Sequence, residues 1–398
     1  MAEGMAARGH RVVVFTTNSN LNETLDVATD RPKIVENVEV WYFHQANPLA
    51  GMFSRWSYFS KSMGYLYTPD LAKVVKRAIS SFDLAHVHMP FVYPCHRTAW
   101  AAIHSRKPLF YHQRGVFDPA RLKFRSLKKT ISILALDRPI MRRASMLFAL
   151  TDAERQDYRA LGVETPCRVI PNGIDAPRYR QMPSNEWCFR WGIRPDELVI
   201  LYLSRIHPIK GPDILLEAFL RVGRKLPKVR LVLAGPDEWG LEGEFRRRGT
   251  AAGLSERVVF PGLVTGEDKL NLLARADLFC LPSVSEGFSM AVLEALASGT
   301  PVMLSPGCHF PEVKARGAGW IVPRDVVPWS RAITDVLREP SRLKIAGSEG
   351  LRLVKEEYTW ERVLAQTERA YFDVLEERRD ASVRSVGVGK SVGVAHGC

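Results

Sequence analysis

Two glutamates and two cations are the residues whose types and spacing could do chemistry in this sequence. Glu286 and Glu294 are separated by seven residues in the stretch SEGFSMAVLEALASG, and Arg205 and Lys210 lie five positions apart in the loop 204–211. An arginine fork and a lysine point charge in one loop can grip a diphosphate from two sides. Since carboxylates would repel such a phosphate, we expect the glutamates to hold hydroxyl groups beside it.

The elements around these residues would place them at one edge of a sheet. The apolar run 277–281 predicts a strand, Ser289 is suited to cap the helix that follows, and Gly299 is suited to end it. The two cations follow another apolar run, 198–203, and precede a helix that begins at Pro212. Ligands bind at the carboxyl ends of strands in open α/β sheets, and a helix start attracts phosphate. Each feature alone is more often solvated surface charge, but the combination predicts a nucleotide-diphosphate site.

Strand-like and helix-like segments alternate along the whole chain, which predicts an α/β fold. A length of 398 residues suits two domains. We therefore expect two doubly wound, Rossmann-like domains that face each other across a cleft. The predicted parts are an N-terminal domain over 1–183, a C-terminal domain over 184–358, a helix over 359–379 and a flexible tail over 380–398.

The positive charge is concentrated in one segment. Residues 51–150 hold 17 Lys and Arg against 4 Asp and Glu, whereas the rest of the chain holds 39 of each sign. The aromatic, basic stretch 51–61 and the amphipathic, basic stretch 120–135 lie in this segment. We expect an anionic membrane surface as its partner, although a solvated face is the commoner explanation of such a helix. Nucleic acid is a weaker alternative and is not expected, because no nucleic-acid-binding module accompanies the charge.

Two further features narrow the class of protein. No apolar run reaches the roughly 18 residues of a membrane span. The six cysteines show no C-x-x-C pair and no metal-ligand spacing, which is typical of reduced thiols. We therefore expect a cytoplasmic protein that is peripheral on the inner face of the cell membrane.

Several motifs together resemble those of family 4 of the retaining glycosyltransferases, which have the GT-B fold. They are RIHPIKGPDILLEAF, SEGFSMAVLEALASGTPV and IPNGID. DLAHVH, YHQRGVFDP and PGCHFPE further resemble members that build bacterial exopolysaccharides or lipopolysaccharides. The resemblance covers about residues 1–378. It implies transfer of a hexose from a UDP- or GDP-linked nucleotide sugar to a glycan or polyprenyl-linked acceptor in cell-surface polysaccharide synthesis. It also implies no metal cofactor, and a C-terminal helix that crosses back to the first domain.

The resemblance assigns roles on the donor side of the site. Arg205 and Lys210 would bind the donor pyrophosphate, Glu286 the donor sugar as a catalytic residue, and Glu294 the ribose hydroxyls. The loop residues expected to meet the sugar and phosphate are Gly287, Phe288, Ser289 and Met290.

The N-terminal half should bind the acceptor. His112 follows a strand, as does the family histidine that reaches the donor sugar, and we assign it that catalytic role, with His88 as the alternative. A histidine in such a place is about as often a core or surface residue with no role. Arg114 and Gly115, beside His112, would face the acceptor. Asn172 lies near the interdomain connection, where a turn former is an equally good explanation.

The sequence departs from the family at its start. Members begin with a strand and a glycine-rich loop ahead of the helix that here opens at Met1, so we expect a truncated sequence, for example from a misassigned start. A real truncation would leave poor stability and little activity. Two other functions therefore stay open: a nucleotide-sugar epimerase of GT-B fold, and a truncated, non-catalytic remnant that binds nucleotide sugar.

Overall fold

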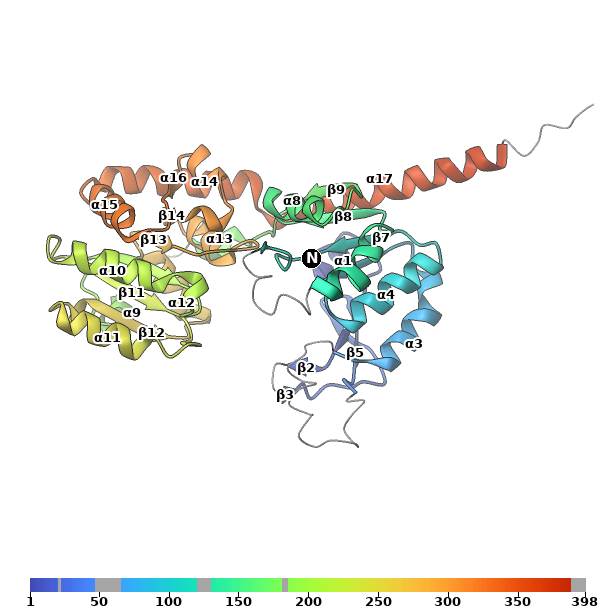
Figure 1. The fold of residues 1–398 in the computed structure, drawn as a ribbon, viewed down its shortest axis with the longest axis horizontal. Coiled ribbons are helices and arrows are strands. Elements are labelled where there is room, and N and C mark those ends of the chain that lie inside the picture. The colour runs from blue at the N-terminus through green and yellow to red at the C-terminus, as the bar shows by residue number, and fades with distance from the viewer. Residues whose placement is uncertain (21–22, 47–65, 120–129, 181–184, 388–398) are drawn as a thin grey trace, which may run out of the picture.

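The computed structural model describes residues 1–20, 23–46, 66–119, 130–180 and 185–387. The described strands and helices gather in two lobes, one from each half of the chain (Figure 1). This arrangement confirms the predicted α/β class.

The C-terminal lobe is built on a six-stranded sheet in which every pair is parallel. Its strands are almost wholly apolar and buried, as expected where helices cover both faces. In sheet order the strands are β12 (Val258–Gly262), β11 (Val229–Ala234), β10 (Leu198–Leu203), β13 (Leu278–Leu281), β14 (Val302–Leu304) and β15 (Gly319–Ile321). The main helices are α9 (Asn185–Arg190), α10 (Pro212–Gly223), α11 (Glu242–Ala251), α12 (Gly266–Arg275), α13 (Met290–Ala297), α14 (Glu312–Ala315), α15 (Val326–Leu337) and α16 (Pro340–Glu357).

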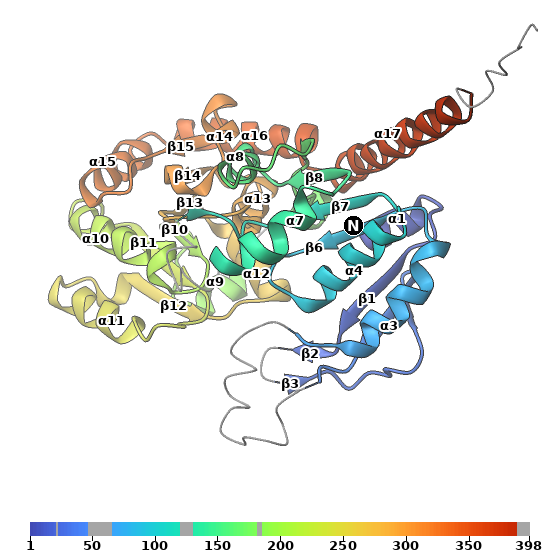
Figure 2. The ribbon, with the colours of Figure 1, turned by 45° about the vertical axis from the view of Figure 1, so that its right-hand side comes forward.

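The N-terminal lobe has its main strands in two sheets; in Figure 2 the helix α4 (Tyr93–His104) lies beside β6 of one sheet, and α3 (Pro69–Ala78) lies beside β1 of the other. One is a parallel sheet with the order β6 (Ala85–His88), β7 (Leu109–His112), β8 (Met146–Ala149) and β9 (Cys167–Val169). The other has the order β1 (Val13–Thr17), β5 (Val38–Phe43) and β4 (Lys33–Val35), and a short hairpin joins β2 (Ser19–Asn20) to β3 (Glu23–Thr24). The helices are α1 (Ala2–Ala7), α3 (Pro69–Ala78), α4 (Tyr93–His104), α7 (Arg138–Met141) and α8 (Asp152–Ala160). That a further strand belongs ahead of α1 stays a prediction.

The last helix, α17 (Trp360–Gly387), crosses from the C-terminal lobe to the N-terminal one (Figure 1). Its buried residues Val363, Ala370 and Val374 share an apolar cluster with Phe110 of β7 and Phe148 of β8. This contact confirms the predicted crossing. The predicted end of the helix at residue 379 is wrong, because the structure describes it as helix through Gly387, eight residues into the predicted tail.

The membrane prediction rests largely on residues outside the described part of the chain. These are the stretch 51–61 and the first ten residues of 120–135. Of the helices that the structure does describe, none combines the length and the apolar character that crossing a bilayer requires. The domain boundary predicted at residue 183 also lies outside the described residues and stays a prediction.

Candidate active site

The donor-side residues lie where the strand order of the C-terminal sheet reverses. Strands β10 and β13 are parallel neighbours, and the chain proceeds outward from them in opposite directions. Arg205 and Lys210 follow β10, and Glu286 follows β13. Such a reversal leaves a crevice at the carboxyl ends of the strands, which is where open α/β sheets bind ligands.

Local structure around these loops follows the sequence prediction. The Ser289 hydroxyl caps α13 by accepting a hydrogen bond from the N–H of Val292 at 3.4 Å. Gly299 follows the helix with a φ of +79°. Gly211 is required by packing as well as by its φ of +70°, since a Cβ there would lie 2.2 Å from the Pro282 carbonyl oxygen. The two loops therefore pack backbone to backbone, which brings their charged side chains together.

Lys210 and Glu286 form a buried ion pair. The Lys210 Nζ donates to both Glu286 carboxylate oxygens at 2.7 Å, and the two residues are 8% and 5% exposed. The sequence predicts both residues but not their contact. The ion pair neutralises two buried charges, either of which would be costly to leave unpaired.

Arg205 has a carboxylate partner on the exposed side of the same loop. Its Nη1 donates to Glu238 at 2.6 Å, and both side chains are about half exposed. Next to this pair, the exposed Trp239 ring packs edge-on against His207, with centroids 4.7 Å apart. An anion reaching Arg205 would thus replace an exposed ion pair, which is weak.

Glu294 is held by two residues that sequence reasoning missed. Its Oε1 accepts hydrogen bonds from the Tyr179 hydroxyl at 3.0 Å and from the Lys269 Nζ at 2.8 Å. Burial and the neighbouring Glu294 raise the pKa of Tyr179, so the phenol stays a donor. No sequence signal marks either partner, because they come from different elements far along the chain.

On the opposite lobe, the structure brings the acceptor-side candidates together. The Arg114 Nη1 donates to Asn172 Oδ1 at 2.6 Å, and its Nη2 donates to His88 Nδ1 at 3.1 Å. Gly115 touches Gly287 in the loop between β13 and α13, hereafter the donor loop, because a Cβ on Gly115 would lie 2.5 Å from the Gly287 Cα. The two predicted halves of the site therefore meet.

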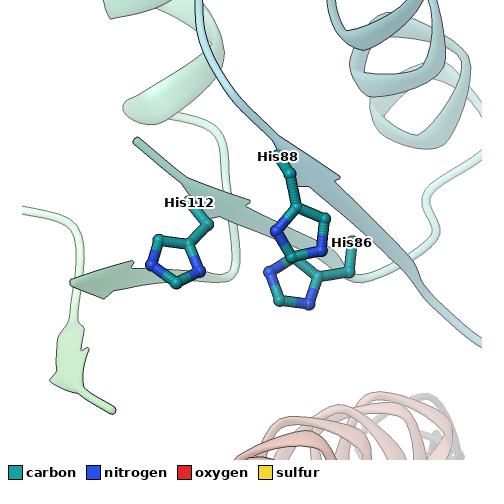
Figure 3. Close-up of side chains that lie close together, drawn as sticks. All are labelled: His86, His88 and His112. Carbon is teal, nitrogen blue, oxygen red and sulfur yellow. The ribbon is translucent and has the colours of Figure 1, made fainter. Parts of the chain in front are cut away.

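His112 lies at the end of β7 in a cluster with His86 and His88 of β6 (Figure 3). It is 1% exposed, and neither of its ring nitrogens has a hydrogen-bond partner among the residues that the structure describes. Burial lowers the pKa of all three imidazoles, Arg114 adds to the effect, and the pKa of His88 falls to about 3. The cluster is therefore neutral, and the catalytic role of His112 stays a prediction.

The three imidazoles could each offer one nitrogen to a metal ion, and these atoms lie within 4.8 Å of one another. Two features oppose a divalent cation. The His86 and His88 rings are stacked with centroids 4.1 Å apart, so their lone pairs run side by side rather than toward one point. Arg114 also places a positive charge beside His88. The cluster is better suited to accept hydrogen bonds than to hold a metal.

Glu154 is the main residue of the site that the sequence does not reveal. It is 2% exposed, and its Oε2 accepts a hydrogen bond from the Leu150 N–H at 2.7 Å. Its Oε1 lies 3.3 Å from where a Cβ on either Gly115 or Gly287 would be. Burial raises the pKa of this carboxyl to about 7. The pattern Thr151-x-x-Glu154 indicates a helix cap, and the structure confirms this cap. Because the cap alone explains a glutamate at this position, the sequence gives no reason to place the Glu154 carboxyl in the site.

Behind the donor loop, both lobes line a cavity of about 630 Å³. Phe288 lines it and packs against Phe310 and Tyr358, with ring centroids 5.4 and 5.8 Å away. His309 Nδ1 lies 2.9 Å from the Glu286 carbonyl oxygen and fixes the loop from this side. The Phe288 side chain thus supports the loop through its contacts with the Phe310 and Tyr358 rings.

Two Rossmann-like lobes with a site between them define the GT-B class, and solved structures confirm this fold. The complex of Anabaena Alr3699/HepE with UDP and glucose has a TM-score of 0.67 at 21% identity, over 85% of this chain and 87% of that one. Sucrose-phosphate synthase from Thermosynechococcus elongatus has a TM-score of 0.69 at 21% identity, over 94% and 92%. WaaG, a glycosyltransferase involved in lipopolysaccharide biosynthesis, has a TM-score of 0.63 at 17% identity, over 94% and 93%.

The sequence of each lobe matches a model of a glycosyltransferase family. Residues 1–178 match the model of Glycosyltransferase Family 4, and residues 183–351 match that of Glycosyl transferases group 1. Each half of the chain is thus similar to a glycosyltransferase family. The D-inositol 3-phosphate glycosyltransferases of Mycolicibacterium smegmatis and Mycobacterium marinum are 31% and 30% identical over 60% and 61% of this chain. The matches cover 56% and 54% of those proteins, so the chain spans little more than half the length of these relatives.

Proposed function

We propose that this chain is a retaining glycosyltransferase that moves a hexose from a UDP- or GDP-linked nucleotide sugar to a glycan or polyprenyl-linked acceptor in cell-surface polysaccharide synthesis. The observation that carries the proposal is the pairing of Lys210 with Glu286 on the loops that precede α10 and α13, with Arg205 on the first of these loops and Glu294 within α13. Two cations, a helix N-terminus and two carboxylates match a diphosphate flanked by two sets of hydroxyl groups.

Donor binding would exchange partners within the site. The diphosphate takes Lys210 and Arg205 from Glu286 and Glu238, and the freed Glu286 accepts hydrogen bonds from the hydroxyls of the sugar. Glu294, already an acceptor for Tyr179 and Lys269, would hold the ribose hydroxyls. The sugar hydroxyls would then replace Lys210 as the hydrogen-bond partners of Glu286, so the buried ion pair does not block the ligand.

The same cations would serve the chemical step. Negative charge grows on the leaving diphosphate, and fixed positive groups aimed at it lower the barrier. Arg205, Lys210 and the start of α13 supply that charge, so the proposal includes no metal. Retention without an enzymatic nucleophile fits attack from the side that the diphosphate leaves, with the diphosphate helping to deprotonate the acceptor.

The similar proteins support this reaction class. Alr3699/HepE has been solved with UDP and glucose and with UDP-glucose, which favours a UDP-linked donor for this chain as well. The curated relatives are named for transfer to D-inositol 3-phosphate. WaaG acts in lipopolysaccharide biosynthesis, which favours the proposed place in cell-surface glycan synthesis.

The proposal includes an inner-membrane surface as the place of work. Exposed basic residues on the N-terminal lobe support it, among them Lys73, Lys76 and Arg77 of α3. Exposed apolar residues near the neighbouring basic stretch add to this, namely Ile131, Leu134 and Leu136. Anionic lipids attract such a surface with about 1 kcal/mol per basic residue.

The first experiment is a thermal-shift screen of the purified chain against UDP, GDP and ADP. A ligand that binds only the folded state at 100 times its Kd stabilises it by about 2.7 kcal/mol. Arg205→Ala should weaken binding of the nucleotide that stabilises the wild type at least tenfold, because a charge-assisted hydrogen bond contributes about 1.5–3 kcal/mol. Lys228→Ala, which breaks the exposed Lys228–Asp196 pair, is the matched control and should bind as the wild type does.

Activity assays then separate the alternatives. Transfer to an acceptor that is lost in Arg205→Ala and Glu286→Ala supports the proposal, whereas sugar conversion without any acceptor would indicate an epimerase. Nucleotide binding with no turnover in a full acceptor screen would indicate a non-catalytic remnant. A folded wild type that no nucleoside diphosphate stabilises contradicts the donor site itself.

A further inference from the structure

Arg114 is a positive charge whose hydrogen-bond partners are neutral. Its Nη1 donates to the Asn172 amide oxygen, and its Nε and Nη2 share the His88 Nδ1, at 3.3 and 3.1 Å. No carboxylate of the described residues forms an ion pair with this guanidinium. A guanidinium has five N–H donors, so two are left over after these contacts.

The groups around Arg114 do not supply the missing negative charge. The imidazoles of His86, His88 and His112 are neutral because burial lowers their pKa values. Glu154 is the nearest acidic group that acts on Arg114, but its own carboxyl has a pKa of about 7 and holds the Leu150 N–H instead. Burial lowers the pKa of Arg114 as well, which is the sign of a cation short of solvent and counter-ion.

The backbone holds this cation in place at a cost. Arg114 has a φ of +57° and Gly115 a φ of +72°, so two successive residues occupy the left-handed region directly after β7. A left-handed residue with a side chain costs about 1–2 kcal/mol. Strain of this kind persists where the surrounding structure fixes the residue, and it gathers at ligand sites. Arg114 keeps part of its surface open to solvent, so a ligand can reach it.

We propose that Arg114, held by Asn172 and His88, binds an anionic group of the acceptor, a phosphate or a carboxylate, beside the reacting end of the donor. The proposal rests on the proposed transferase function and narrows its acceptor to an anionic class. Arginine suits both anions, because its planar fork matches their paired oxygens.

The anion is assigned to the acceptor because the donor diphosphate has its own cations. Arg205 and Lys210 both lie on the C-terminal lobe, after β10. Arg114 lies on the N-terminal lobe, one residue before the Gly115 that touches Gly287 of the donor loop. An anion on Arg114 would therefore sit next to the transferred sugar but apart from the diphosphate cations.

Matched pairs of probes test the proposal by titration calorimetry on the full chain. One pair is myo-inositol 1-phosphate against myo-inositol, and the other is glucuronate against glucose, so the two arms separate phosphate from carboxylate. Each probe is titrated with and without a saturating amount of the nucleotide that stabilises the chain. We expect one anionic probe to bind at least tenfold more tightly than its neutral partner.

Three variants locate the binding. Arg114→Gln should lose the preference for the anion, Arg114→Lys should keep part of it, and Arg205→Gln should keep it while losing the nucleotide. A thermal melt checks that each variant is folded. The proposal is overturned if Arg114→Gln keeps the preference, or if neither anion is preferred by the wild type. It is also overturned if nucleotide competes with the anion and Arg205→Gln abolishes both, because the anion would then occupy the donor site.

The two proposals fail in distinguishable ways. If no nucleotide binds but the anion preference depends on Arg114, the transferase function fails and the anion site stands. If nucleotide binds and sugar is transferred to neutral acceptors equally well by wild type and Arg114→Gln, the transferase stands and the anionic acceptor fails.

Discussion

Glu154 places one titratable carboxyl where the two lobes touch. It is 2% exposed and lies beside the contact of Gly115 with Gly287. Burial raises its pKa from 4.5 to about 7, so its charge changes near neutral pH rather than in acid. Ionisation of Glu154 buries a negative charge between the lobes, so it should lower the free energy of unfolding.

The pH dependence has a definite sign. Between pH 4.5 and about 7 the folded state holds a proton on Glu154 that the unfolded state has released. Raising the pH through this window therefore destabilises the folded chain, by on the order of 3 kcal/mol once the group is fully ionised. Glu154→Gln cannot ionise, and its amide oxygen still accepts from Leu150. The variant should gain about this much stability relative to wild type between pH 5 and pH 8.

Urea unfolding of both proteins at the two pH values measures this difference. Because the histidines and the other acids titrate equally in both proteins, their contributions cancel in the comparison. A stability difference that stays the same at pH 5 and pH 8 would mean that Glu154 is ionised throughout and that the buried carboxyl has a different environment.

At the scale of the elements, the parts of the site that depend on local sequence could be predicted. The cap at Ser289, the left-handed Gly299 and the start of α10 at Pro212 all follow from residues within a turn of the feature. The same holds for Arg205 and Lys210, whose loop lies between a strand and a helix that both have strong signals.

Contacts between distant elements could not be predicted, because no pattern in one element names its partner in another. Lys210 and Glu286 were both expected in the site, but their pairing depends on how β10 and β13 align. Tyr179 and Lys269 stayed hidden for the same reason. The division of the N-terminal strands into two sheets likewise depends on tertiary packing rather than on strand composition.

The contact of the loop after β7 with the donor loop predicts different effects for alanine at three glycines. Gly115 and Gly253 both have a φ of +72°, but only Gly115 has atoms where a Cβ would go. Gly115→Ala and Gly253→Ala should each lose about 1–2 kcal/mol of stability from the left-handed backbone. Only Gly115→Ala should also slow sugar transfer, by tenfold or more, because a shift of about 1 Å at a reacting site can cost about a hundredfold.

Gly287→Ala completes the test, since a Cβ there would lie 2.8 Å from the Gly115 Cα without the strain of a positive φ. It should slow transfer much as Gly115→Ala does, with a smaller loss of stability. Unfolding free energies and transfer rates of the three variants are measured side by side. Wild-type rates in both Gly115→Ala and Gly287→Ala would show that the lobes do not meet here during the reaction.

At the scale of the whole molecule, the two lobes differ in charge. The excess positive charge falls within 51–150, in the lobe that carries Arg114, whereas the rest of the chain is balanced. Helix α17 ties the lobes together through its cluster with Phe110 and Phe148. A lobe attached to an anionic surface would therefore keep the donor lobe near the same surface, where a lipid-linked acceptor would be found.

This arrangement predicts binding to anionic vesicles through α3. Neutralising Lys73, Lys76 and Arg77 to Gln should weaken binding to vesicles of phosphatidylserine in phosphatidylcholine at least tenfold, because each basic residue contributes about 1 kcal/mol. The control carries the same three changes at exposed basic positions of the C-terminal lobe, namely Arg331, Arg338 and Lys344. Co-sedimentation should show the control bound as wild type, and wild type released by salt, since the screening length is about 10 Å at 0.1 M and shrinks as salt rises. Equal losses in both triple variants would mean that net charge, rather than this face of the N-terminal lobe, attracts the protein to lipid.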